Sequence, residues 1–121
     1  MKDSTGSSIL QRIEAAGRKV LPMHKLLAES DPKTFDSFDG FLTHSIYRKG
    51  GLSDGHKEML LACICVGAGS APPVIANHCR KALAAGLSRD DLIQALEITA
   101  AVAATRTLAS GINAVIAAEE S

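Results

Sequence analysis

One short stretch, residues 71–86, contains two residue types that often carry acid–base or thiol chemistry. It reads APPVIANHCRKALAAG, and its His78 is followed directly by Cys79. Histidine is the usual proton carrier near neutral pH, and a cysteine thiolate is a nucleophile. Both residues also have structural interpretations. His78 can be a core histidine bonded to a backbone carbonyl, and Cys79 can be a small packed side chain.

A carboxylate precedes this stretch, in the segment DGHKEMLLACICVG. On a helix, Glu58 shares a face with Leu61, Ala62 and Cys65, which follow it by three, four and seven residues. A carboxylate that begins an apolar face is costly to bury without a partner. Glu58 therefore either pairs with a polar group of a neighbouring helix or stays exposed one turn inside its own helix.

The cysteines do not form a recognisable redox pair. Cys63 and Cys65 lie two residues apart, so on a helix their side chains point about 200° from each other and cannot form a disulfide. Both are interpreted as small core residues. For Cys79 we keep open whether it packs or reacts. Three cysteines are an odd count, which favours reduced thiols.

Composition narrows the classes of partner. The 13 basic residues balance the 13 acidic ones, and no basic block or interleaved aromatic stripe is present. We therefore expect no nucleic-acid partner and no polybasic membrane anchor. By this sequence reading no apolar run approaches the ~20 residues of a membrane span, and residues 1–10 lack the apolar region of a signal peptide. These features favour a cytoplasmic protein without a membrane partner.

Periodicity predicts an all-α fold, a compact bundle of about six helices. The 121 residues fit one domain, which we divide into an N-terminal helical arm, residues 1–30, and a core, residues 31–118. The first predicted segment, residues 7–30, is one bent helix or two short ones. It is followed by a helix capped by Asp31, a buried helix after Ser53, one opened by Pro72 or Pro73, one started by Ser88, and a weaker last segment, 105–120, interrupted by Gly111. Alanine-rich runs in the last two segments favour association with another helix or subunit.

The motif in residues 78–86 carries a family resemblance. His-x-Arg-x-Ala-Leu-x-x-Gly, followed by a capped helix and preceded by a Glu-bearing helix, resembles the carboxymuconolactone decarboxylase family, whose other branch is the alkyl hydroperoxidase D-like proteins. The resemblance covers about residues 32–118. It implies an all-helical bundle assembled into homo-oligomers such as trimers or hexamers.

The hydroperoxidase branch carries a Cys-x-x-Cys pair before the histidine. Here those two positions hold Ala71 and Val74, neither of which can form a thiolate. The decarboxylase branch, which keeps the histidine without the pair, resembles this chain better.

The resemblance implies that Glu58 and His78 line one cleft and act as acid and base on a small carboxylated, lactone-type substrate, without cofactor or metal. A cation would hold a substrate carboxylate. We select Arg106 for this role and interpret Arg80 as a surface residue. Two alternatives stay open: a non-catalytic oligomeric binding or regulatory protein, and a hydroperoxide-reducing protein that uses Cys79. His24, His44 and His56 are interpreted as surface or capping residues.

Overall fold

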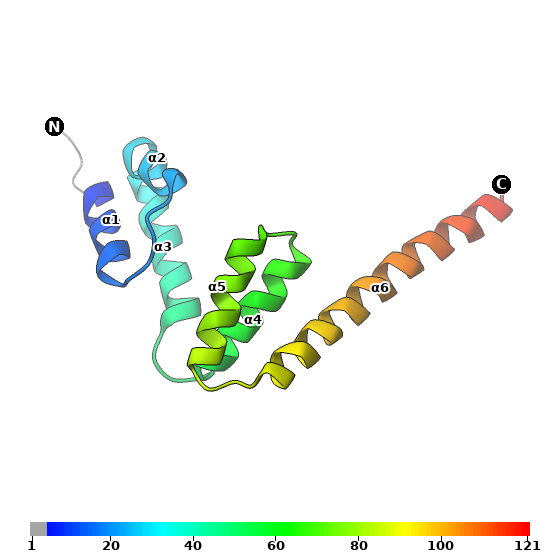
Figure 1. The fold of residues 1–121 in the computed structure, drawn as a ribbon. Coiled ribbons are helices and arrows are strands. Elements are labelled where there is room, and N and C mark those ends of the chain that lie inside the picture. Colours follow the sequence, from blue (N-terminus) through cyan, green and yellow to red (C-terminus); the bar gives the residue numbers. More distant parts are fainter. Residues whose placement is uncertain (1–4) are drawn as a thin grey trace. The chain divides into compact units, whose positions relative to one another are not determined.

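The computed structural model describes residues 5–121 and contains only helices within them, which confirms the all-α class. Six helices follow one another along this part of the chain (Figure 1): α1 (Thr5–Ala15), α2 (Pro22–Ser30), α3 (Pro32–Tyr47), α4 (Asp54–Gly67), α5 (Pro72–Ala84) and α6 (Arg89–Glu119). These described residues form two compact units, one up to residue 49 and one from residue 50 to residue 121.

The first unit is held by contacts among α1, α2 and α3. Its core consists of Ile9 and Ile13 of α1 packed against Phe35 of α3, and all three side chains are fully buried. Gly6 lies directly against the Ala28 backbone, where a Cβ would clash with the carbonyl group. The absence of a side chain at residue 6 therefore lets α1 approach α2 closely.

The N-terminal segment forms two helices, one of the two predicted alternatives. Gly17 adopts a positive φ of 73° after α1, a conformation that favours glycine, and Pro22 is the first residue of α2. The predicted start of α3 is confirmed: the Thr34 backbone N–H donates to the Asp31 carboxylate at 3.0 Å, and Pro32 is the first helical residue. Helix α3 packs on both α1 and α2. The expected division into an arm and a core between residues 30 and 31 stays a prediction.

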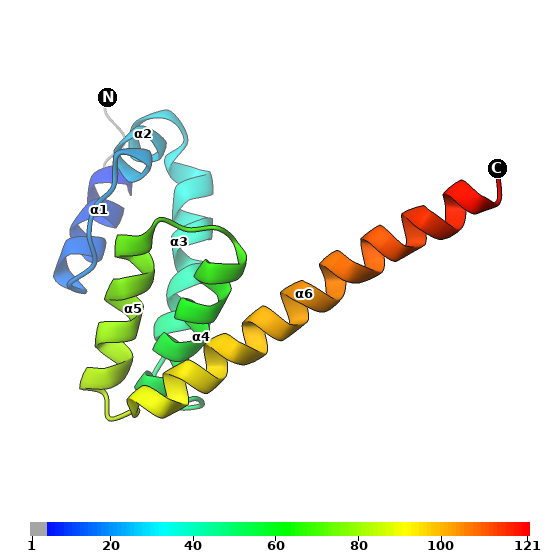
Figure 2. The same ribbon diagram turned by 45° about the vertical axis from the view of Figure 1, so that its right-hand side comes forward.

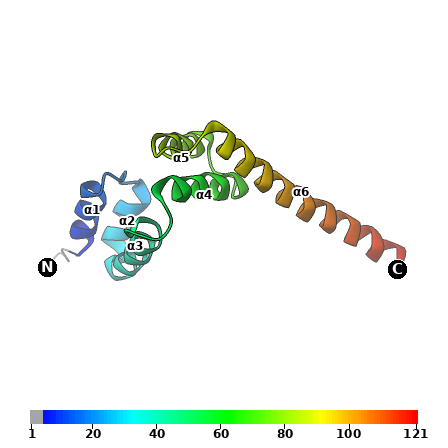
Figure 3. The same cartoon turned by 90° about the horizontal axis from the view of Figure 1, so that it is seen from below.

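In the second unit α4 and α5 lie side by side, and α6 packs against α4 (Figures 1 and 3). The predicted caps are confirmed. The Ser53 hydroxyl accepts from the His56 backbone N–H, and Ser88 forms a reciprocal capping box with Asp91. Gly69 and Gly86 have φ values of 75° and 102° at the turns that follow α4 and α5.

Helix α6 corrects two expectations. It continues through Gly111 without a break, because one glycine lowers helix stability only by about 1 kcal/mol and the rest of the segment is rich in alanine, the best helix former. Its 31 residues include an 18-residue window of mean hydropathy 1.3, long and apolar enough to cross a membrane by length and composition alone. The premise that no apolar stretch approached that length is therefore wrong for α6.

Apolar side chains of the second unit are exposed on α4 and α6. Leu60, Ile64 and Val66 of α4 are exposed, so the prediction of a buried helix after Ser53 is wrong for the single chain. Every residue from 101 to 121 is exposed, and this half of α6 extends away from α4 and α5 (Figure 2). A helix that is apolar on all faces is normally covered by protein or lipid.

Candidate acid–base site

The structure brings Glu58 and His78 together. Glu58 Oε2 lies 2.7 Å from His78 Nδ1, within hydrogen-bond distance, and joins α4 to α5. The side chains of Glu58 and His78 are 15% and 17% exposed, so the pair is mostly buried but keeps some contact with solvent. The spacing of His78 predicted a polar side chain between helices. For Glu58, pairing with a polar group of a neighbouring helix was one of the two alternatives.

Two alanines allow this close contact. Ala62 follows Glu58 by one helical turn on α4, and Ala82 follows His78 by one turn on α5; both are fully buried. Since alanine fills little volume, the helix backbones can approach closely next to the pair. The short turn 68–71 between the helices makes them antiparallel neighbours, which places residues 58 and 78 side by side.

Contact with Glu58 defines the roles of the two ring nitrogens of His78. A carboxylate only accepts hydrogen bonds, so Nδ1 carries the proton that Glu58 accepts. Among residues 5–121 no side chain or backbone group bonds Nε2. This second nitrogen can therefore exchange a proton with a bound molecule, while Glu58 keeps the ring oriented.

None of the three cysteines forms a disulfide, and each is half-buried. Cys63 and Cys65 are on α4, and Cys79 follows His78 on α5. Ala71 is the N-cap residue of α5 and Val74 lies in its first turn, so the positions of the hydroperoxidase pair are at the start of the histidine-bearing helix. The interpretation of Cys63 and Cys65 as core residues holds only in part, because neither is fully buried.

The predicted cation does not lie with the pair within one chain. Arg106 is in the exposed half of α6, where a shallow hollow is lined by Ala101, Val102, Thr105, Arg106 and Ala109. Arg106 is also the only charged residue between Glu97 and Glu119. Arg80 is exposed on α5, in agreement with its interpretation as a surface residue.

The remaining histidines serve helix starts or lie at the surface. His24 is buried, stacks on Phe35 at 5.7 Å between ring centroids, and accepts a hydrogen bond from the Leu21 backbone N–H through Nδ1. His56 bonds the Ser53 hydroxyl, and His44 is exposed. Within residues 5–121 no three metal-ligating side chains form a cluster.

Sequence reasoning missed Asp39, a buried carboxylate in the first unit that pairs with Arg18 at 3.0 Å. A signal for it is present in the sequence. Asp39 follows Phe35 by four residues, so both lie on the same buried face of α3. An acidic residue on such a face requires a cationic partner.

Comparison with known proteins identifies the family. The profile of the carboxymuconolactone decarboxylase family matches residues 32–118, which is most of the chain. The chain belongs to this family. No curated protein and no solved structure matches it significantly.

The carboxymuconolactone decarboxylase match spans α3, α4, α5 and most of α6. It therefore contains Glu58, His78 and Arg106, whereas α1 and α2 precede it. The resemblance to this family that was predicted from the sequence is therefore confirmed.

Proposed function

We propose that this protein is a cofactor-independent acid–base lyase that decarboxylates a small carboxylated, lactone-type molecule. The observation that carries the proposal is the 2.7 Å contact between Glu58 Oε2 and His78 Nδ1 in a mostly buried position. Membership of the carboxymuconolactone decarboxylase family supports this choice of reaction.

In the proposed reaction His78 supplies the proton. The C–C bond to the substrate carboxylate breaks, carbon dioxide leaves, and the electron pair of that bond stays on the substrate. The protonated ring of His78 then donates its Nε2 proton to the substrate, and the neutral ring regains a proton from solvent. Glu58 accepts the hydrogen bond at Nδ1 in both states, so the ring keeps its orientation throughout.

We further propose that the protein acts as a homo-oligomer, a trimer or hexamer as the family resemblance implies. Support comes from the exposed apolar side chains of α4 and α6, among them Ile64, Val102 and Leu108. Arg106 lies in the exposed part of α6, where it can reach another copy of the chain. In the oligomer it would hold a substrate carboxylate at the Glu58–His78 pair of that copy.

Thiol chemistry receives less support. A peroxidase cycle needs an attacking thiolate and a resolving thiol, and the usual positions for them hold Ala71 and Val74. Cys79 is half-buried beside His78 in sequence, but neighbouring residues on a helix point about 100° apart.

Release of carbon dioxide from a panel of carboxylated lactones tests the proposal. The Glu58→Gln/His78→Ala double variant is the matched blank, since it removes both functional groups. We expect release by the wild type and none above background by the double variant. Ligand binding without turnover by the wild type would favour the non-catalytic binding protein instead.

A further inference from the structure

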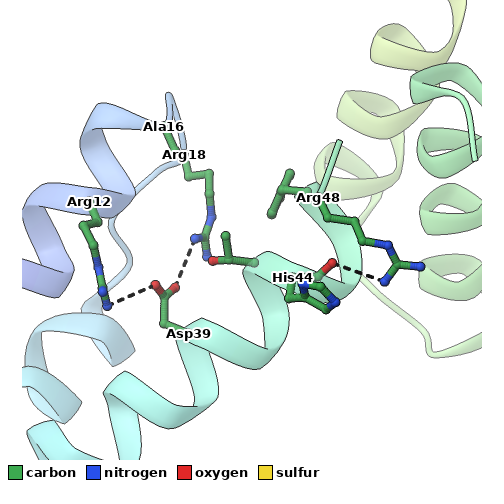
Figure 4. A pocket seen from close by; sticks show the side chains of 9 residues that line it. Arg12, Ala16, Arg18, Asp39, His44 and Arg48 are labelled. Atoms are coloured by element: carbon green, nitrogen blue, oxygen red, sulfur yellow. Dashed lines mark hydrogen bonds and ion pairs between the residues drawn. The ribbon is translucent and has the colours of Figure 1, made fainter. Parts of the chain in front are cut away.

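A hollow of about 400 Å³ lies between α1 and α3, entirely within the first unit (Figure 4). It is lined by Arg12, Ala16, Arg18, Asp39, Gly40, Thr43, His44, Tyr47 and Arg48. Its volume falls in the range of about 300–1,000 Å³ that is typical of small-molecule sites. A third of the lining residues, Arg12, Ala16 and Arg18, precede the family match.

Asp39 positions two of the arginines. Its side chain is only 7% exposed and lies 3.0 Å from Arg18 Nη1 and 3.7 Å from Arg12 Nη2. Arg12 Nη2 also contacts Asp36 at 2.8 Å. One buried carboxylate therefore holds both guanidinium groups at the hollow, as Figure 4 shows.

These guanidinium groups can still donate to a ligand. Each has five N–H donors, and the ion pairs above use one terminal nitrogen of Arg12 and one of Arg18. The lining contains three arginines and one carboxylate; Arg48 bonds the His44 carbonyl, so Arg12 and Arg18 are the two guanidinium groups beside Asp39. A planar carboxylate matches the fork geometry of a guanidinium group better than a spherical anion does.

The rest of the wall includes apolar and planar groups beside the polar side chains of Thr43, His44 and Arg48. Ala16 contributes a methyl group, and Gly40 contributes no side chain. The Arg18 guanidinium lies over the Tyr47 ring, 5.2 Å from its centroid, so two planar groups lie together in this part of the wall. This wall suits a flat apolar body attached to the carboxylate.

We infer that the first unit binds a small organic monocarboxylate with a flat apolar body, its carboxylate on Arg12 and Arg18 and its body against Tyr47. The site contains neither Glu58 nor His78, so it is distinct from the proposed catalytic site.

Isothermal titration calorimetry of the full chain with benzoate tests this inference. We expect saturable binding with a Kd of about 1 mM or tighter, measured up to about 20 mM ligand. Benzamide, which has the same body without the charge, should bind at least about 10-fold more weakly. Equal binding of both, no saturable benzoate binding, or binding of inorganic phosphate in its place would overturn the inference.

Gly40→Leu locates the site. A Cβ at Gly40 meets no atom within 4 Å, so leucine fills the hollow without displacing the helix. We expect it to weaken benzoate binding at least about 10-fold, whereas Ser45→Leu, at an exposed position of α3 outside the hollow, retains binding. His78→Ala should also retain it. Retained binding in Gly40→Leu, or loss in His78→Ala, would contradict the location.

Discussion

Glu58 Oε2 and His78 Nδ1 lie 2.7 Å apart and join α4 to α5 through a mostly buried polar contact. Replacing either residue by alanine leaves the other without its partner, so we expect each single variant to lose about 1–3 kcal/mol of unfolding free energy. The double variant should lose less than the sum, because no orphaned group remains.

Urea denaturation of the four proteins in this cycle measures the coupling between the two side chains. Additive losses would show that the contact contributes nothing to stability.

Ala82 tests whether close packing of α4 and α5 maintains the pair. It is fully buried, so Ala82→Leu should overpack the helix interface, lower the unfolding free energy by about 1–3 kcal/mol and separate Glu58 from His78. The thermal unfolding temperature and the turnover rate of the variant should decrease together. Ala84→Leu is the matched control, since Ala84 is exposed on the same helix. Equal effects of both substitutions would argue against a packing constraint.

The exposed half of α6 should be an interface between copies of the chain. Leu108 and Ile112 lie one turn apart on it and are both exposed. The Leu108→Lys/Ile112→Lys variant should therefore reduce the molar mass measured by light scattering, because charges cannot be buried there without partners. Asn113→Lys adds a charge without removing an apolar contact and serves as the comparison. A wild-type protein that stays monomeric at every concentration would refute this prediction.

Acid should weaken the start of α6. The hydrogen bond donated by the Ser88 backbone N–H holds the pKa of Asp91 below its ordinary value of 3.8. Because the folded-state pKa is the lower one, this contribution to stability is complete above the unfolded pKa and is lost as pH falls through the folded pKa.

Asp91→Asn keeps an acceptor for the cap but does not titrate. Its unfolding free energy should therefore fall less steeply than that of the wild type between about pH 5 and pH 2. Asp90→Asn serves as the comparison, because it removes the charge of a neighbouring carboxylate that makes no such cap bond. Identical slopes for the wild type and Asp91→Asn would contradict a role for this carboxylate.

The fold could be predicted where local chemistry determines it. Asp31, Ser53 and Ser88 each satisfy a backbone N–H at a helix start, and such caps are visible in the sequence. The interruption predicted at Gly111 is absent, because an isolated glycine lowers helix stability without ending the helix.

The candidate site was predictable only in part. Its residue types and helix faces suggested Glu58 and His78, but their contact depends on how α4 packs against α5. The buried carboxylate of Asp39 depends in the same way on contacts between helices distant in sequence. Spacing can place each residue on a buried face, but it does not identify the partner on the other helix.

The identity of the proton donor is tested most directly by comparing His78→Ala with Cys79→Ala in the rate of carbon dioxide release from a lactone substrate that the wild type turns over. Both variants must first be shown to be folded by circular dichroism. We expect His78→Ala to lose about 100-fold or more in turnover, the contribution of a positioned acid or base, and Cys79→Ala to retain nearly full activity. Full turnover by folded His78→Ala would contradict the proposed function.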